Sequence, residues 1–283
     1  MLNGCAYILT VDVGNTFIRF GLFAEDSAAA QECPLATCEI TTPSSITADE
    51  ARMRLAQVMG ALAADAGMPG ALVPASAVLS CVVPALERPW KAALSRTCTG
   101  RVLTVGPGLK TGMPVHYDDP AEIGPDRIAD AVAARAVYGS PCIVIDLGTT
   151  TNIEVIDAHG TFVGGVIAPG LALGARSLSA AAARLPQVEP SAPTHVIGRN
   201  TREAMRSGVV LGEVARIDGM LDMVLAEMRA TKAAGEGSVP IVITGDDAEA
   251  LAALVGHSLT VDDALTLRGL AELYHINQKP RRA

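Results

Sequence analysis

The sequence predicts an α/β protein built from two similar halves with a cleft between them. Two short acidic turns, Asp12-Val-Gly-Asn-Thr16 and Asp146-Leu-Gly-Thr149, each stand between β-rich runs, about half of the chain apart. The composition is 49% hydrophobic but only 3% aromatic, so the core must be aliphatic, which suits strands buried on both faces. The order of the expected elements is also similar on the two sides of a boundary near Ser140.

The first half begins with a hairpin and continues with alternating helices and strands. We expect strands over 7–13 and 16–24, because the Gly14-Asn15 pair between them tolerates the positive φ angles of tight turns. Thr47-Ala-Asp-Glu50 is a capping box that predicts a helix reaching about residue 66. The other expected elements are strands at 35–41, 75–83 and 101–105, a helix that Pro84 begins, and a helix over 128–137.

The second half repeats this order. The expected elements are strands near 142–147, 152–157 and 161–167, a helix from 169 to before Pro186, a long helix from the Asn200 cap to about 230, a strand over 239–244, a helix after the turn at 245–247, a strand over 258–261 and a helix over 262–275. The long helix has a wide apolar face, which predicts a core face, a subunit interface or a mixture of the two. Its members are Met205, Val209, Val210, Val214, Ile217, Met220, Leu221 and Val224.

Charge and cysteine usage restrict the function classes. The net charge is −8 and the pI is about 5.1, which argues against non-specific binding to nucleic acid or to an anionic membrane. No apolar stretch is long enough for a membrane span. The six cysteines form no Cys-x-x-Cys pair, which fits a reducing cytoplasm and no zinc site.

The acidic turns and one further block supply the parts that phosphoryl transfer needs. Such turns present backbone N–H groups to phosphates, and their acids offer oxygen ligands to hard cations. Gly124-Pro-Asp-Arg127 stands at a helix N-terminus, which favours anions. Asp126 is a candidate base and Arg127 a candidate partner for a substrate carboxylate. The alternative for Asp126 is an ordinary first-turn acid that stabilises the helix by about 0.3–1 kcal/mol.

The ordered blocks of the chain resemble the type III pantothenate kinases, of the acetate-kinase/sugar-kinase/chaperone-ATPase/actin superfamily. The resemblance rests on Asp-x-Gly-Asn-Thr at 12–16, the block from Tyr117 to Arg127, Ile-Asp-x-Gly-Thr at 145–149, Gly-Gly-x-Ile-x-Pro-Gly at 164–170, Gly198-x-x-Thr201, Thr244-Gly245 and Leu-Thr-Leu-Arg-Gly-Leu at 265–270. It implies two ribonuclease-H-like (actin-like ATPase) domains, 1–140 and 141–283, each a mixed sheet flanked by helices, with the active site in the cleft between them.

The resemblance also implies an activity and its residues. The activity is transfer of the ATP γ-phosphate to the primary hydroxyl of pantothenate, which gives 4′-phosphopantothenate in the first step of coenzyme A biosynthesis. Asp126 would be the catalytic base, Asp12 would hold Mg²⁺, directly or through water, and Asp146 would hold K⁺ or NH₄⁺. ATP contacts would come from Asp12, Val13, Gly14, Asn15, Thr16, Phe17, Ile18, Arg19 and Thr149. Pantothenate contacts would come from Tyr117, Gly124, Pro125, Asp126, Arg127 and Thr201. Members are similar in being homodimers.

Three positions depart from the family pattern. Pro125 replaces a usual alanine, Asn152 replaces a usual threonine, and Asp246 stands where a second glycine is usual. Pro125 removes one N–H donor, and Asp246 adds a charge where adenosine should lie. Two alternatives stay open: a non-catalytic regulatory relative that keeps the fold, and a kinase for another small hydroxylated acid.

Overall fold

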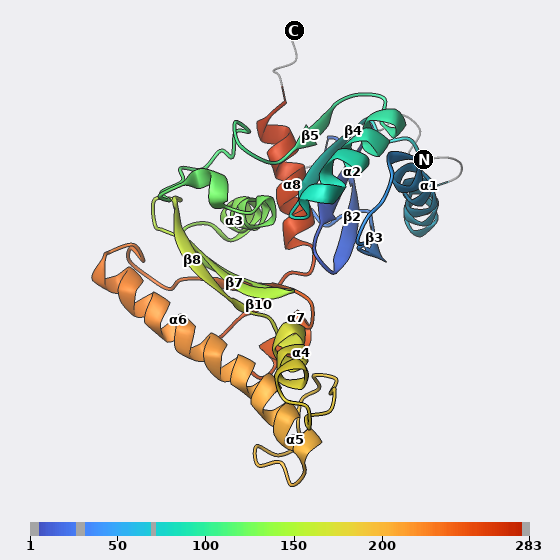
Figure 1. Ribbon diagram of the computed structural model, residues 1–283. Helices are drawn as coiled ribbons and strands as arrows, with labels where there is room; N and C mark the ends of the chain where they lie inside the picture. Colours follow the sequence, from blue (N-terminus) through green and yellow to red (C-terminus); the bar gives the residue numbers. More distant parts are fainter. Residues whose placement is uncertain (1–5, 27–31, 69–71, 279–283) are drawn as a thin grey trace. The chain divides into compact units, whose positions relative to one another are not determined.

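The computed structural model describes residues 6–26, 32–68 and 72–278. These residues group into two compact units (Figure 1). Unit 1 comprises Met1–Val137 together with Ala264–Ala283, and unit 2 comprises Tyr138–Asp263. Each unit contains one five-stranded sheet.

The sheet of unit 1 has the strand order β3-β2-β1-β4-β5. Its strands are β1 (Tyr7–Val13), β2 (Phe17–Ala24), β3 (Ala36–Thr41), β4 (Ser76–Cys81) and β5 (Val102–Thr104). Strands β1 and β3 each run antiparallel to β2. Strand β4 runs parallel to β1, and β5 runs parallel to β4. The predicted hairpin and the three further strands of this half are therefore confirmed.

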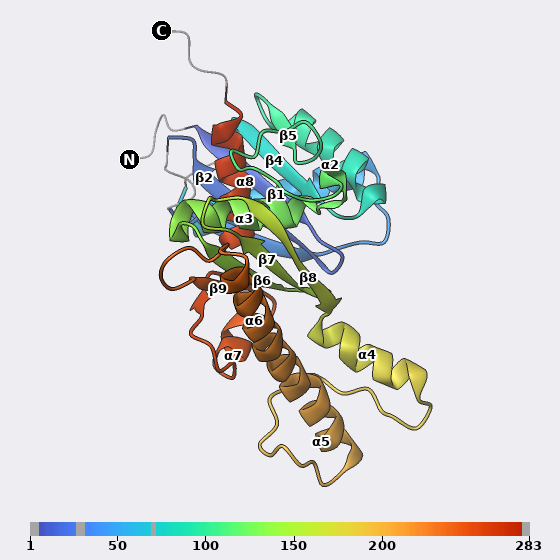
Figure 2. The ribbon, with the colours of Figure 1, turned by 90° about the vertical axis from the view of Figure 1, so that its left-hand side faces the viewer.

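Alternation along β1 separates core residues from site residues. Leu9, Val11 and Val13 are fully buried in the main apolar cluster under the helices α1 (Ala48–Asp65) and α2 (Pro84–Thr97). Because successive side chains of a strand point to opposite faces, Thr10 and Asp12 face the other side of the sheet. That side is covered by α8 (Leu265–Ile276), which packs on β1, β2 and β4 (Figure 2).

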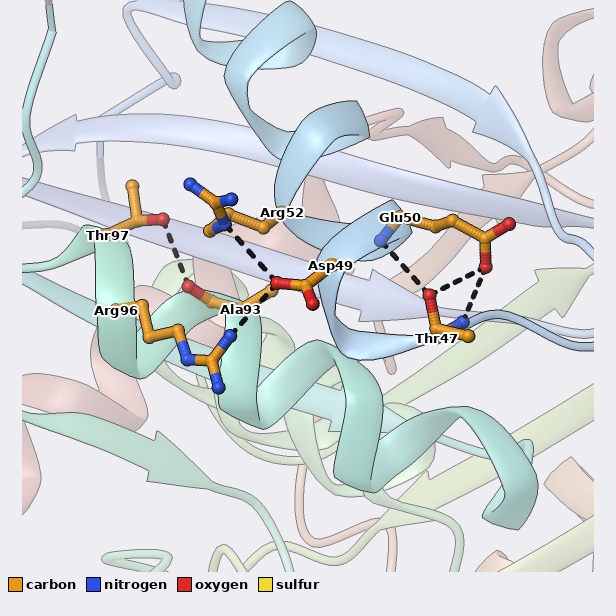
Figure 3. A network of polar contacts seen from close by, with 7 residues as sticks. All are labelled: Thr47, Asp49, Glu50, Arg52, Ala93, Arg96 and Thr97. Carbon is orange, nitrogen blue, oxygen red and sulfur yellow. Dashed lines mark hydrogen bonds and ion pairs between the residues drawn. The ribbon is translucent and has the colours of Figure 1, made fainter.

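Helices α1 and α2 lie side by side and their ends are held by polar contacts (Figure 3). The capping box predicted at the start of α1 is confirmed: the Glu50 carboxylate accepts from the Thr47 backbone N–H at 2.8 Å, and the Thr47 hydroxyl accepts from Glu50 N at 3.2 Å. Arg96 of α2 pairs with Asp49 of α1 at 3.1 Å. This ion pair is exposed, so its contribution to stability is small.

Unit 2 repeats the topology of unit 1. Its sheet has the order β10-β9-β6-β7-β8, formed by β6 (Cys142–Leu147), β7 (Thr150–Ile156), β8 (Phe162–Pro169), β9 (Ile241–Gly245) and β10 (Thr260–Val261). Strands β6, β7 and β8 are antiparallel neighbours, and β9 and β10 run parallel to β6. The short helix α7 (Ala248–Ala252) precedes β10. The same order and the same directions in both sheets confirm the predicted duplication.

The predicted long helix of unit 2 contains an irregular turn. It runs as α5 (Thr201–Arg206), a π-helical turn η2 (Ser207–Leu211) and α6 (Gly212–Ala230), which follow one another along one rod in Figure 2. Of its apolar face, Met205, Val210, Val214, Ile217 and Leu221 are buried. The preceding helix α4 (Leu171–Ala181) is shorter than expected. The core role predicted for the face is confirmed.

The last helix groups with unit 1, whereas the sequence led us to expect it in the second half. The Tyr274 hydroxyl of α8 donates to the Glu25 carboxylate at 2.7 Å and accepts from the Ser76 hydroxyl at 2.9 Å. The helix also lies against α3 (Pro125–Tyr138), where a Cβ on Gly269 would come within 1.9 Å of the Ala129 carbonyl oxygen. Long-range packing of this kind leaves no local signal in the sequence.

The remaining expectations concern cysteines, loops and membranes. The five cysteines in the described part, Cys33, Cys38, Cys81, Cys98 and Cys142, are free thiols, and Cys5 lies outside it. A 3₁₀ turn, η1 (Pro120–Glu122), lies in the loop before α3. Over the described ranges, no helix is long and apolar enough to cross a membrane.

The contact between α3 and α8 predicts that two glycine-to-alanine substitutions have opposite effects on stability. Gly269→Ala should lower the free energy of unfolding by about 1–3 kcal/mol, because the added methyl collides with backbone. The matched control is Gly60→Ala on α1, where nothing lies within 4 Å of the new methyl. The control should raise stability by roughly 0.5–1 kcal/mol. Urea unfolding of both variants measures the difference, and equal effects would contradict the close helix contact.

Candidate functional site

The first acidic turn forms the tip of the β1–β2 hairpin. Gly14 N donates to Phe17 O at 3.0 Å, and the Thr42 hydroxyl donates to Gly14 O at 2.7 Å. Asn15 and Thr16 are exposed at the tip. The reason given for this hairpin was wrong, because neither Gly14 nor Asn15 has a positive φ. The tip is instead held by its own hydrogen bond and by the residue that follows β3.

Asp12 is a buried carboxylate at the end of β1. Its side chain lies on the face opposite the main apolar cluster, between Arg19 of β2 and Ser80 of β4 in the register of the sheet. Burial and, to a smaller extent, the negative charge of Asp126 raise the pKa of Asp12 to about 6, although Ser80 and Arg19 act to lower it. Two acids predicted to have different roles are therefore close enough to interact within unit 1.

Asp126 lies in the first turn of α3, and its local conformation depends on Gly124. The Asp126 carboxylate accepts from the backbone N–H of Arg127 at 2.8 Å. A Cβ on Gly124 would come within 2.4 Å of Oδ1 of Asp126, so a larger residue would displace this carboxylate. Pro125 begins the helix, where a missing N–H costs no helical hydrogen bond. Burial raises the pKa of Asp126, while Arg127 acts to lower it.

An arginine lies next to each of the two acids of unit 1: Arg19 beside Asp12 and Arg127 beside Asp126. Arg127 is only 5% exposed although it carries a full charge. Arg19 lies over the Phe17 ring and pairs with Glu39 of β3 at 2.9 Å. Tyr117, in the loop before α3, is half-buried. Unit 1 thus brings together the predicted phosphate turn, the candidate base and the candidate carboxylate-binding arginine.

Unit 2 presents the second acidic turn in the same position of its own sheet. Asp146 lies beside Asn152 of β7 and Thr244 of β9 in the sheet register, and Asn152 donates to its Oδ2 at 3.4 Å. Thr149 O accepts from Gly170 N at 3.0 Å. A Cβ on Gly170 would come within 2.2 Å of Gly148 O, so the start of α4 must be glycine to approach this turn.

The segment that carries the unusual Asp246 supports the same turn. The backbone N–H of Asp246 donates to Leu147 O at 2.5 Å. Gly245 has a φ of +91°, and a Cβ there would come within 2.1 Å of Leu147 O. Asp247, at φ 58°, adopts the left-handed conformation, which aspartate tolerates better than most residues. The turn thus keeps its shape without a second glycine.

Thr201 is the first residue of α5 in unit 2 and is exposed. Asn200 caps this helix by accepting from Glu203 N at 3.0 Å. A Cβ on Gly198 would come within 2.2 Å of Ala204 N, which explains the glycine of the Gly198-x-x-Thr201 block. Of the predicted site residues, Asp146, Thr149 and Thr201 belong to unit 2 and all others to unit 1.

The donor set of unit 1 fits a hydrated divalent cation. Within the described residues, Oδ1 of Asp12 is buried and has no hydrogen-bond partner. Hard cations such as Mg²⁺ take carboxylate oxygens of this kind together with phosphates and water. In the described part of the chain, no group of three or more His, Cys, Asp or Glu side chains could hold a metal ion. Phosphate oxygens and water would therefore have to complete the coordination shell.

Sequence reasoning missed several supporting residues. Ser80 was detectable as a polar residue within the apolar run of β4, at the register position of Asp12. Thr42 gave no signal, because its partner Gly14 lies in another part of the chain. Glu213 and Arg216 of α6 were missed as well, although they contact β7 and the end of β8 next to the second turn.

Two copies of one five-stranded sheet, each with an acidic turn at the end of its first strand, define a ribonuclease-H-like (actin-like ATPase) fold. A protein from Campylobacter jejuni described as a Baf family transcriptional activator is similar over 95% of this chain and 98% of its own, with a TM-score of 0.56 and 18% identity. The ethanolamine utilization protein EutJ from Carboxydothermus hydrogenoformans has a TM-score of 0.54 at 16% identity, over 94% of this chain and 89% of its own. At these identities the likeness shows the fold alone.

The sequence comparisons identify the family. The type III pantothenate kinase family model matches residues 8–223. Curated type III pantothenate kinases are similar over nearly the whole chain: the protein of Koribacter versatilis is 37% identical over 97% of both chains. That of Nocardia farcinica is 39% identical over 97% of this chain and 99% of its own. This chain belongs to the type III pantothenate kinase family.

The raised pKa of Asp12 predicts a pH-dependent stability without divalent cations. Because the folded state holds this proton more tightly than the unfolded chain, whose pKa is near 3.8, the free energy of unfolding should fall as pH rises to about 7. Asp12→Asn should remove this loss and stabilise the protein by on the order of 2–3 kcal/mol near pH 7.5, but not near pH 4. Urea unfolding across this range measures it.

The control for this experiment is Asp118→Asn, which neutralises an exposed acid of unit 1. It should leave the pH profile unchanged. A stabilisation by Asp12→Asn that is the same at both ends of the pH range would contradict a raised pKa for this carboxyl.

Proposed function

We propose that this chain is an ATP-dependent pantothenate kinase that phosphorylates the primary hydroxyl of pantothenate to give 4′-phosphopantothenate, the first step of coenzyme A biosynthesis. The observation that carries the proposal is the placement of Asp126 beside the first phosphate turn and directly before the buried Arg127. Curated relatives that carry this activity in their names match nearly the full chain.

Asp126 is proposed as the base that accepts the proton of the attacking hydroxyl. Its Oδ1 is held by the N–H of Arg127, which fixes the direction of the carboxylate and leaves Oδ2 for the acceptor. Burial raises its pKa, which makes the ionised form a stronger base. The adjacent guanidinium keeps the ionised form accessible.

The carboxylate of pantothenate needs an anion site, and the start of α3 offers one. Arg127 is buried, so its charge is screened weakly by solvent. The positive end of the helix dipole adds to this attraction. We assign pantothenate contacts to Tyr117, Gly124, Pro125, Asp126, Arg127 and Thr201.

The ATP side is proposed to involve residues of both acidic turns. Residues 12–19 contact the phosphates, with Asp12 holding Mg²⁺ directly or through water, and Thr149 also contacts ATP. Mg²⁺ neutralises the charge that develops on the transferring phosphoryl group. In the sheet register Asp146 has Asn152 and Thr244 as neighbours, and we assign the monovalent ion, K⁺ or NH₄⁺, to its carboxylate.

The assembly is proposed to be a homodimer in the cytoplasm. Unit 2 exposes large apolar side chains, among them Val196 at 74% and Ile197 at 83%. Exposed apolar groups of this kind commonly mark subunit contacts. The free cysteines of the described part are compatible with a reducing compartment.

A coupled assay of ADP release across several acceptors tests the proposal. With ATP, Mg²⁺ and K⁺, pantothenate should give turnover, and other small hydroxylated acids should give little. Leaving out K⁺ and NH₄⁺ should lower the rate, because the Asp146 site is then empty. A rate that is indifferent to monovalent cations would remove Asp146 from that role. No turnover with any acceptor would favour a regulatory relative, and turnover with another acid alone would reassign the substrate.

The base assignment predicts the behaviour of one isosteric variant. Asp126→Asn should lower kcat by roughly 10²–10⁴-fold, because the amide cannot accept the proton. Nucleotide binding and thermal stability should stay near those of the wild type. Asp118→Asn, an exposed acid before the same helix, serves as the control and should keep full activity. Near-normal turnover of Asp126→Asn would exclude this residue as the base.

A further inference from the structure

A buried polar network of unit 2 lies behind the second acidic turn. Glu213 of α6 is only 5% exposed, and its Oε1 accepts from the Thr151 hydroxyl of β7 at 2.6 Å. Its Oε2 pairs with Nη2 of Arg216, one turn further along α6. A buried carboxylate of this kind is stable only while both partners remain in place.

The network continues to the backbone of the second turn. Nη2 of Arg216 also donates to the Pro169 carbonyl oxygen at 2.5 Å, at the last residue of β8. The next residue, Gly170, donates its N–H to Thr149 O at 3.0 Å and leaves no room for a Cβ beside Gly148. One chain of contacts therefore runs from Glu213 through Arg216 and Pro169 to Thr149.

A second path reaches the same turn through the sheet. Thr151 follows Thr149 by two residues on the edge of the turn, and Gly148 N donates to Thr150 O at 2.9 Å. The hydroxyl of Thr151 is the atom that Glu213 holds. The carboxylate thus contacts two segments next to the turn: β7 directly, and the end of β8 through Arg216.

We propose that Glu213, Arg216 and Thr151 are positioning residues that hold the Asp146–Thr149 turn in the shape that binds nucleotide. This inference rests on the proposed function, since it assigns Thr149 to ATP. The network reaches the turn through the backbone of the neighbouring residues, Gly170 and Thr150. Its loss should therefore weaken nucleotide binding while acceptor binding at α3 is kept.

The geometry favours arginine over lysine at position 216. One guanidinium nitrogen contacts both the Glu213 carboxylate and the Pro169 carbonyl, and the planar group keeps its direction between them. A lysine keeps the charge but holds two acceptors less firmly. Side chains that only stabilised the core would not need this directionality.

The test compares matched pairs of variants of the full-length protein. Arg216→Met and Thr151→Val remove the side-chain donors at these positions, whereas Arg216→Lys and Thr151→Ser each retain one. The control is Asp222→Asn, which neutralises an exposed carboxylate of the same helix, 3.2 Å from Nε2 of His257. Each variant is examined for its ADP affinity by calorimetry, its KM for ATP and for pantothenate, and its thermal unfolding.

The donor-removing variants should weaken ADP binding and raise the KM for ATP by roughly five- to tenfold, because small displacements of a binding turn are costly. The KM for pantothenate should stay within about twofold. Thr151→Ser should recover most of the ADP affinity, and Arg216→Lys only part of it, because a lysine holds the two acceptors less firmly. The control should bind ADP as the wild type does.

Three outcomes would overturn the inference: unchanged ADP affinity in both donor-removing variants, equal rises of the two KM values, or no binding of ADP by the wild type. ADP binding by the wild type without turnover of pantothenate would overturn the proposed function alone. In that case the affinities still decide the role of the network. If Arg216→Met fails to fold, the comparison of Thr151→Val with Thr151→Ser decides the role of the network.

Discussion

Burial of the Asp12 carboxylate at the end of a core strand is the constraint on which the site of unit 1 depends. The strand must keep Leu9, Val11 and Val13 in the core, so alternation fixes Asp12 on the opposite face. There the carboxylate is desolvated and lies near a second acid. Ser80 and Arg19 offset only part of the cost of desolvating the carboxylate charge. A cation that enters with a phosphate ligand would offset the rest.

Comparison of the two sheets shows how one scaffold gives two different acidic turns. Asp12 and Asp146 occupy equivalent strand ends, and each has a hydroxyl residue on the parallel neighbour, Ser80 or Thr244. Their antiparallel neighbours differ, since Asp12 faces the cation Arg19 whereas Asp146 faces the neutral Asn152. The two turns therefore share a backbone position but differ in the residue on the antiparallel neighbour.

Local signals in the sequence were enough to predict most of the fold. The capping box of α1, the β-rich runs around each acidic turn and the proline at the start of α2 all act within a few residues, so their meaning does not depend on distant packing. The hairpin was predicted correctly but for a wrong reason, because Gly14 keeps a negative φ. The position of α8 depended on its contact with Ala129, which no pattern in the sequence announces.

The site was predictable only where an acid or a glycine stood in a turn. Glycines at 170, 198 and 245 looked alike in the sequence, yet each proves to be needed where two backbones nearly touch. Glu213 escaped notice because an acid at this spacing from Arg216 usually forms an exposed helical pair. Its second partner, Thr151, lies on another element, so only the fold shows that this acid is buried. Residues that support a turn from another element are thus hidden from the sequence for a physical reason: their contacts are made only when the sheet and the helix have assembled.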